Sequence, residues 1–208
     1  MSYKIIVARY NENIRWLKSE ISNCIVYTKG NKLHIENEIH LENVGRESET
    51  YLHYIITNYD NLPDVVVFTQ ARISDHNNTG HDDIDYLIQM KNSALCNSKS
   101  QNFFIHNDVG RCRYFDKNWN LQPWNGYYLK HNYKNNNPIT FFEWFKSNID
   151  INYPNPIHVY RNGIFAVKKE HIINKPIEYY QRLILEVNHH INSAEGHFFE
   201  RSWYYIFN

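Results

Sequence analysis

The chain has 208 residues, enough to bury a sizeable core, and this length predicts one domain over 1–208. Its 22 Lys and Arg residues balance its 22 Asp and Glu residues without a basic run, so we expect no nucleic-acid partner. Three scattered cysteines fit a reducing compartment, and no apolar run could form a signal-peptide core or cross a bilayer, which predicts a cytoplasmic protein without a membrane span.

The first half of the chain predicts a strand, helix, strand layout. Strand-like runs occupy 5–8 and 24–27, with a short helix through 14–17 between them. A crossover helix should begin near Ser48 and pack on the sheet before the next strand begins. Its apolar residues recur at helical spacing: Leu52, Ile55, Ile56 and Tyr59.

The run at 65–68 predicts the central strand of the sheet. Its residues are apolar on both faces, as in a parallel strand covered by helices, and a turn at 61–64 precedes it. The run breaks off into polar residues, and ligands of open α/β sheets gather at the carboxyl ends of such strands. We therefore expect a site among the residues that follow: Gln70, Arg72, Asp75, His76 and Asn77.

Helices and strands should continue beyond this strand. Residues 82–85 open a helix, and strands are expected at 103–106 and 113–115. The exposed rings of an aromatic loop at 119–128 could stack on sugars. Pro138 suits the first position of the strongly apolar helix that follows.

The last third of the chain completes the predicted architecture. A late strand is expected at 159–167, where Gly163 permits close approach of the backbone. Pro176 should start a long helix whose apolar face continues to Ile191, and a terminal helix should begin within 195–203. The pattern predicts an α/β fold with a mostly parallel central sheet flanked by helices.

Three arginines form a candidate anion site. Arg9, Arg46 and Arg72 are each predicted in a loop after or near the end of a strand. Guanidinium groups hold a diphosphate by paired hydrogen bonds that lysine does not match. The alternative is that each is a solvated surface arginine.

Two places could hold a divalent cation that bridges a nucleotide's diphosphate. Asp83 and Asp85 match an Asp-x-Asp spacing, but acids are common at the start of a helix, where they cap amides and suit the dipole. Asp75 lies nearer the end of the central strand and is the preferred metal ligand, with His76 either a second ligand or a hydrogen-bond partner.

Glu200 is the preferred candidate for a general base. On a helix, Glu200 and His197 share a face at i, i+3, which suits a carboxylate base beside a proton partner. The alternative is a surface ion pair between Glu200 and Arg201 or a lysine. No Gly-rich phosphate loop, nucleophile elbow, Cys-x-x-Cys pair or His-Glu-x-x-His occurs, which disfavours P-loop kinases, Rossmann dehydrogenases, serine hydrolases and zincins.

Three groups of residues carry a resemblance that covers nearly the whole chain. They are 6–12 with 16–17, then 43–47 with 51–52 and 55–64, and finally 163–167 with 200–203 and 206–207. In these segments the chain resembles a family of small GT-A-type glycosyltransferase domains, formerly of unknown function. It is also similar to the small glycosyltransferase domain of large algal DNA viruses, which would place a viral protein in the host cytoplasm.

The resemblance implies a compact GT-A fold, a nucleotide-sugar donor of the UDP type, and Mn²⁺ or Mg²⁺ as cofactor. The nucleobase would rest near Arg9, Tyr10 and Asn11, with Gly45 and Arg46 nearby. In such an enzyme the metal and the arginines neutralise the departing diphosphate.

The end of the predicted central strand also matches the family. Its members usually carry Gln-Gly or His-Gly there and a His downstream, matched by Gln70 and His76, with Ala71 in place of the glycine. With the anion site and the metal site argued above, we expect Gln70 and Arg72 to contact the donor and Asp75 and His76 to hold the metal.

The expected function is therefore metal-assisted transfer of a sugar, with inversion, from a nucleotide-diphosphate donor to a glycan, glycoprotein or other hydroxyl acceptor. Glu200 would remove the acceptor's proton. One alternative is a catalytically silent carbohydrate-binding relative that keeps the aromatic loop at 119–128. The other is a metal-dependent hydrolase whose ligands would be His76, His81, Asp83 and Asp85.

Overall fold

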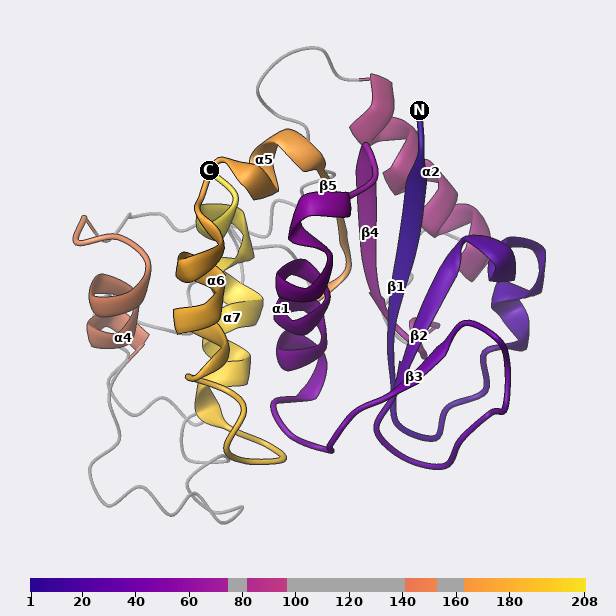
Figure 1. The fold of residues 1–208 in the computed structure, drawn as a ribbon, viewed down its shortest axis with the longest axis horizontal. Coiled ribbons are helices and arrows are strands. Elements are labelled where there is room, and N and C mark those ends of the chain that lie inside the picture. Colours follow the sequence, from indigo (N-terminus) through magenta and orange to yellow (C-terminus); the bar gives the residue numbers. More distant parts are fainter. Residues whose placement is uncertain (75–81, 97–140, 153–162) are drawn as a thin grey trace.

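A computed structural model describes residues 1–74, 82–96, 141–152 and 163–208. They form a five-stranded sheet in the order β3-β2-β1-β4-β5, flanked by helices, which confirms the predicted α/β class (Figure 1). The strands are β1 (Tyr3–Arg9), β2 (Cys24–Thr28), β3 (Glu38–His40), β4 (Val65–Gln70) and β5 (Phe165–Lys168).

Four of the five strands are parallel. Strand β1 pairs with β2 on one side and with β4 on the other, β2 pairs with β3, and β5 is an antiparallel edge strand beside β4. Parallel neighbours need crossover connections. The 3₁₀ helix η1 (Arg15–Asn23) makes the first, and α1 (Arg46–Asn58) with η2 (Tyr59–Asn61) leads from β3 back to β4. This agrees with the predicted central strand and crossover helix.

Two hydrophobic layers cover the sheet, because its strands expose apolar residues on both faces. In β1, Ile6 packs into one layer, whereas Ile5 and Val7 pack into the other. The first layer is built from α1, α4 (Phe141–Asn148), α6 (Ile177–Ile184) and α7 (Ala194–Ile206). The second is built from η1 and α2 (Asp83–Cys96), on the other side of the sheet.

Aromatic packing fixes α7 against α1 and the sheet. The ring of Tyr51 in α1 lies 4.8 Å from that of Phe68 in β4 and 5.9 Å from that of Trp203 in α7, measured between centroids. Such ring pairs contribute beyond the area that they bury. The Tyr51 hydroxyl donates a hydrogen bond of 2.8 Å to the backbone oxygen of Gly163, so this phenol is buried without losing its partner.

Some predicted elements differ from the observed ones. The helix that starts after Pro176 was expected to reach Ile191 but ends at Ile184, and Ile191 is 52% exposed. Backbone bonds of the i to i−3 type follow, so Val187 stays buried in a turn at nearly helical spacing. Strand β3 and the short helix α5 (Lys169–Ile173) were not predicted, because three or five residues carry too little periodicity.

Other predictions concern residues outside the described ranges: the strands at 103–106 and 113–115, the aromatic loop at 119–128 and the helix start at Pro138. The late strand was expected at 159–167, of which 163–167 are described. The observed strand, β5, begins at Phe165. Within the described ranges, no helix is long and apolar enough to cross a bilayer.

Candidate functional site

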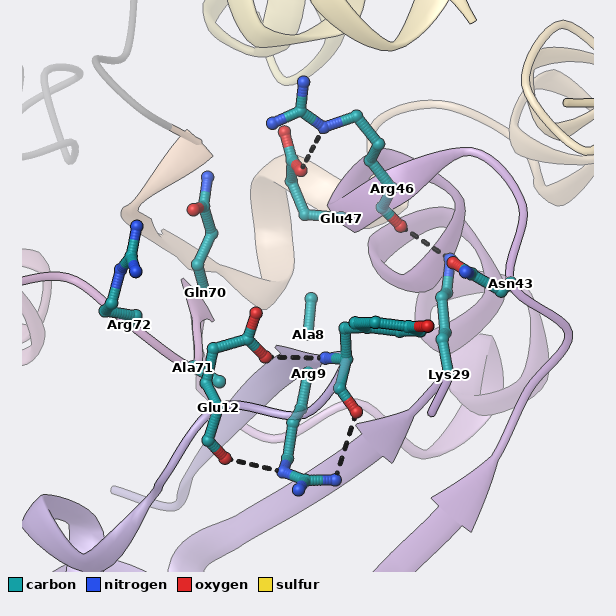
Figure 2. Close-up of a pocket in the computed structure, with 11 residues that line it drawn as sticks. Ala8, Arg9, Glu12, Lys29, Asn43, Arg46, Glu47, Gln70, Ala71 and Arg72 are labelled. Atoms are coloured by element: carbon teal, nitrogen blue, oxygen red, sulfur yellow. Dashed lines mark hydrogen bonds and ion pairs between the residues drawn. The ribbon is translucent and has the colours of Figure 1, made fainter. Parts of the chain in front are cut away.

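A pocket of about 480 Å³ opens where the carboxyl ends of β1, β2 and β4 meet the start of α1. The strand order changes direction at β1, with β2 on one side and β4 on the other. Such switch points form the crevices in which open α/β sheets bind ligands. Its lining residues are Ala8, Arg9, Tyr10, Glu12, Lys29, Asn43, Arg46, Glu47, Gln70, Ala71 and Arg72 (Figure 2).

Arg9 forms part of the wall of this pocket. Its Nε donates to the backbone oxygen of Glu12 at 2.8 Å, and Nη1 donates to those of Asn31 at 2.7 Å and Tyr10 at 3.3 Å. The residue is 7% exposed. This geometry favours a role for Arg9 in holding two loops together over the direct contact with a nucleotide that we expected.

The two residues after Arg9 point to different places. Tyr10 lines the pocket and is 52% exposed, so its ring is available to a ligand. Asn11 is not among the lining residues, because its Oδ1 turns away to accept a hydrogen bond of 2.7 Å from the backbone N–H of Asn31. A Cβ on Gly30 would lie 2.5 Å from that Oδ1, so the Asn11 contact requires a glycine there.

Lys29 fastens β2 to the start of α1. Its Nζ donates to the backbone oxygens of Val44 and Arg46 and lies 2.7 Å from Oε2 of Glu49. The Glu49 contact is an ion pair, whereas the contacts to the two carbonyl oxygens are hydrogen bonds. Burial lowers the pKa of Lys29, and the Glu49 carboxylate opposes that shift.

Gly45 brings the first turn of α1 against the connection between α6 and α7. Its φ is +61°, and a Cβ would lie 2.7 Å from the backbone oxygen of Val187, so glycine is required on both counts. Its N–H donates to the backbone oxygen of His190 at 2.9 Å. Gly45 does not line the pocket, and its effect on the site is to place Arg46.

Arg46 presents a partly exposed guanidinium group at the pocket. Its side chain is 41% exposed, and Nη1 lies 3.1 Å from Nε2 of His197 and 3.4 Å from Oδ1 of Asn192. Its Nε lies 3.6 Å from Oε2 of Glu47. These contacts involve Nε and Nη1 and orient the group.

Gln70 and Arg72 reach the pocket from the end of β4, as the sequence predicted. The chain there is pinned, because Ala71 N donates to the Ala8 oxygen and Trp16 Nε1 donates to the Ala71 oxygen, both at 2.9 Å. Ala71 is buried, which explains why a small residue stands between two polar ones. Figure 2 shows Gln70 and Arg72 on one side of the pocket and Arg46 with Glu47 on another.

The predicted metal ligands Asp75 and His76 lie outside the described ranges, as does His81. Asp83 and Asp85 occupy the first turn of α2, where carboxylates suit the helix dipole. Among the described residues, no group of three His, Cys, Asp or Glu side chains could hold a metal ion. Mn²⁺ or Mg²⁺ binding therefore stays a prediction.

Glu200 lies behind Arg46 rather than in the lining of the pocket. Its Oε2 is 3.8 Å from Nδ1 of His197 and 3.9 Å from Nη1 of Arg201. Burial would raise the pKa of Glu200, but His197, Arg201 and Arg46 lower it to about 2. A base works best with a pKa near the working pH, so this carboxylate is a weak proton acceptor.

His197 links Glu200 to Arg46. Burial and Arg46 lower the pKa of His197, opposed by Glu200, so the ring is neutral near pH 7. An arginine can only donate, which makes Nε2 the acceptor and puts the ring proton on Nδ1, facing Glu200. The arrangement suits positioning of Arg46. Glu195, in the first turn of α7, has Oε2 4.0 Å from Nε2 of His189.

Four polar residues of the pocket were not predicted as site residues: Glu12, Lys29, Asn43 and Glu47. Lys29 directly follows β2, so the strand-end rule that selected Gln70 could have found it. Glu47 stands next to Arg46 in the first turn of α1, and Glu12 follows the loop after β1. Nothing in their spacing distinguished them from ordinary surface charges.

Comparison with known proteins identifies a family but no activity. No curated protein and no solved structure matches the chain. One family profile, described as "Protein of unknown function (DUF3431)", matches residues 5–208, which covers every described helix and strand except the first two residues of β1. The chain therefore belongs to the DUF3431 family of proteins of unknown function.

Proposed function

We propose that this protein is a glycosyltransferase that binds a nucleotide-diphosphate sugar in the pocket at the carboxyl ends of β1, β2 and β4. The observation that carries the proposal is the convergence of Arg46 and Arg72 on that pocket, from α1 and from the end of β4. Two guanidinium groups on separate elements suit a diphosphate, because each can grip oxygens through a planar pair of N–H groups.

The size and charge of the pocket support the same ligand class. Its volume of about 480 Å³ is in the range of sites that take a small organic molecule. The lining carries four cationic side chains and two carboxylates, an excess of two positive charges that suits a diphosphate. The half-exposed ring of Tyr10 offers a surface on which a nucleobase could stack.

In the proposed reaction, an acceptor hydroxyl attacks the anomeric carbon while the bond to the diphosphate breaks. Arg46 and Arg72 would stabilise the charge that develops on the departing diphosphate. Mn²⁺ or Mg²⁺, when bound, would neutralise more of that charge. The residues predicted to hold the metal, Asp75 and His76, lie outside the described ranges.

The UDP-type donor, the glycan or glycoprotein acceptor and inversion at the anomeric carbon belong to the same proposal and follow from the resemblance. Glu200 is the carboxylate expected to take the acceptor's proton. Its low pKa and its place behind His197 support positioning of Arg46 instead, and the Glu200→Gln variant discussed below separates these roles.

Binding of UDP to matched variants tests the proposal. Arg46→Lys and Arg72→Lys keep the charge but lose the planar fork, so calorimetry should find UDP bound about tenfold more weakly by each. Arg15→Lys is the control, because Arg15 is exposed and does not line the pocket. Equal affinities of all three variants and the wild type, or no UDP binding by the wild type, would contradict the proposal. A panel of nucleotide sugars assayed for released nucleotide diphosphate then identifies the donor.

A further inference from the structure

Glu47 is a buried carboxylate on the wall of the pocket. It occupies the first turn of α1, its side chain is 10% exposed, and it lies beside Arg46 (Figure 2). A carboxylate at the start of a helix suits the dipole. That preference explains a negative charge there, but it does not explain why the group faces a cavity with little access to water.

The Glu47 carboxylate lacks the partners that its neighbours have. Its nearest cation, Nε of Arg46, is 3.6 Å away, and it accepts no hydrogen bond from any residue in the described parts of the chain. In contrast, Glu12 accepts a hydrogen bond of 2.7 Å from the Tyr10 N–H, and Glu49 pairs with Lys29 at 2.7 Å. The Glu47 carboxylate lines the pocket and no described residue donates to it, so a donor on a ligand can take that place.

The Glu47 side chain has little freedom to move because it is only 10% exposed. It faces Gly163, where an added Cβ would make ordinary van der Waals contact with Cγ of Glu47 at 3.4 Å. The backbone of Gly163 is held by the Tyr51 hydroxyl and has a φ of +63°, which favours glycine. A buried carboxylate has already lost much of its rotamer freedom, so it can bind a ligand group with little further loss of side-chain entropy.

We propose that Glu47 accepts a hydrogen bond from a hydroxyl group of the ligand, while Arg46 and Arg72 bind the ligand's anionic group. An ionised carboxylate can only accept, so its partner in the ligand must be a donor. The pocket therefore takes one molecule that carries both a phosphate or diphosphate and a hydroxyl. The inference rests on the proposed function in taking a nucleotide sugar as this molecule, whose hydroxyl comes from the ribose or from the sugar.

A series of ligands without added metal tests this assignment in the full chain. Calorimetry compares pyrophosphate, which has no hydroxyl, with UDP, which adds the ribose, and with UDP-glucose, which adds a sugar. Glu47→Gln removes one negative charge, so pyrophosphate should bind about twofold more tightly. The ligand whose hydroxyl Glu47 accepts should instead bind about fivefold more weakly, because the charge-assisted hydrogen bond becomes a weaker, neutral one.

Glu12→Gln is the matched control, because it removes the same charge from the same pocket. Its glutamine can still accept the Tyr10 N–H, so every ligand should bind slightly more tightly. With Glu47→Gln, weakening that first appears at UDP assigns the ribose, and weakening that appears only at UDP-glucose assigns the sugar. Equal tightening of all three ligands by Glu47→Gln would overturn the proposal, and so would weaker binding of pyrophosphate itself.

Two further ligands separate this inference from the proposed function. If UDP and UDP-glucose do not bind the wild type, inorganic phosphate is compared with glucose 1-phosphate. If Glu47→Gln weakens the binding of glucose 1-phosphate but not of phosphate, Glu47 binds a sugar hydroxyl and the ligand is not a nucleotide. Equal responses to both phosphates would overturn the role of Glu47 as well. Circular dichroism of each variant confirms that the comparison is made on folded protein.

Discussion

Four cationic side chains line one pocket, yet they form two groups with different physical roles. Arg9 and Lys29 are 7% and 8% exposed, and their charged groups are occupied by backbone oxygens or by Glu49. Arg72 is exposed, and the Arg46 side chain is 41% exposed. A buried charge must be compensated by fixed partners, whereas an exposed one can exchange water for a ligand.

A side chain that lines a pocket therefore does not have to bind the ligand. Arg9 and Lys29 hold the loops and the first turn of α1 that shape the cavity. Arg46 and Arg72 offer the guanidinium groups that we propose for the anion. Substitution of the first pair should therefore change stability, and substitution of the second pair should change affinity.

The largest expected effect is on Lys29. In Lys29→Met, the Glu49 carboxylate stays buried without its cation and two backbone oxygens lose a donor, so the free energy of unfolding should fall by about 3–5 kcal/mol. Urea unfolding at pH 7 measures the change. Lys32→Met, at an exposed position, is the control and should differ from wild type by less than about 0.5 kcal/mol.

A second substitution sharpens the Lys29 prediction. The pair Lys29→Met with Glu49→Gln removes the stranded charge, so it should be more stable than Lys29→Met alone. A pair whose loss of stability equals the sum of the two single losses would show that Lys29 and Glu49 act independently.

Glu200 should give the next largest effect, and it depends on pH. The folded pKa of about 2 lies below the ordinary value of 4.5, so the ionised carboxylate stabilises the folded state. This contribution is full above about pH 4.5 and is lost as the pH falls toward 2. Urea unfolding should therefore find Glu200→Gln less stable than wild type by up to about 3 kcal/mol at pH 7, with a smaller difference at pH 3.

The same variant separates the two roles of Glu200. If Glu200 positions Arg46 through His197, Glu200→Gln should weaken UDP binding about as much as Arg46→Lys does. If Glu200 is the general base, UDP should bind normally while sugar transfer falls about 10²–10⁴-fold. Unchanged stability, affinity and transfer would contradict both roles.

Arg9 should give the smallest of these effects. Lysine keeps the charge but cannot reach three carbonyl oxygens in the plane of a guanidinium, so Arg9→Lys should cost about 1–2 kcal/mol of stability. Its effect on UDP affinity should be smaller than that of Arg46→Lys. If Arg9→Lys weakened UDP binding more than Arg46→Lys, Arg9 would contact the ligand directly, and the two groups of cationic side chains would not differ in role.

Much of the fold could be read from local pattern. The strands at 5–8, 24–27 and 65–68 were found, and so was the helix before the central strand, because their periodicity and length depend on adjacent residues. The missed elements were those too short to carry a pattern, β3 and α5. The helix after Pro176 was drawn too long because its apolar spacing continues through a turn.

Several predicted site residues, Arg9, Arg46, Gln70 and Arg72, line one pocket, but they differ in burial and in their partners. Parallel strands bring their carboxyl ends together, so Arg9, Gln70 and Arg72 had to lie near one another once the strands were known. The sequence did not indicate that Arg9 would be buried against carbonyls, or that Lys29 would line the same pocket.

Local sequence was enough to identify the residues that follow the strand ends, because the order of strands and turns depends on the spacing of nearby residues. Only the tertiary structure decided which of those residues face a ligand, because partners and burial come from segments far apart in the chain. Arg46 meets His197 across 151 residues, and Gly163 packs on Glu47 from another element. Such contacts set the desolvation and orientation of a charged group, and no local pattern encodes them.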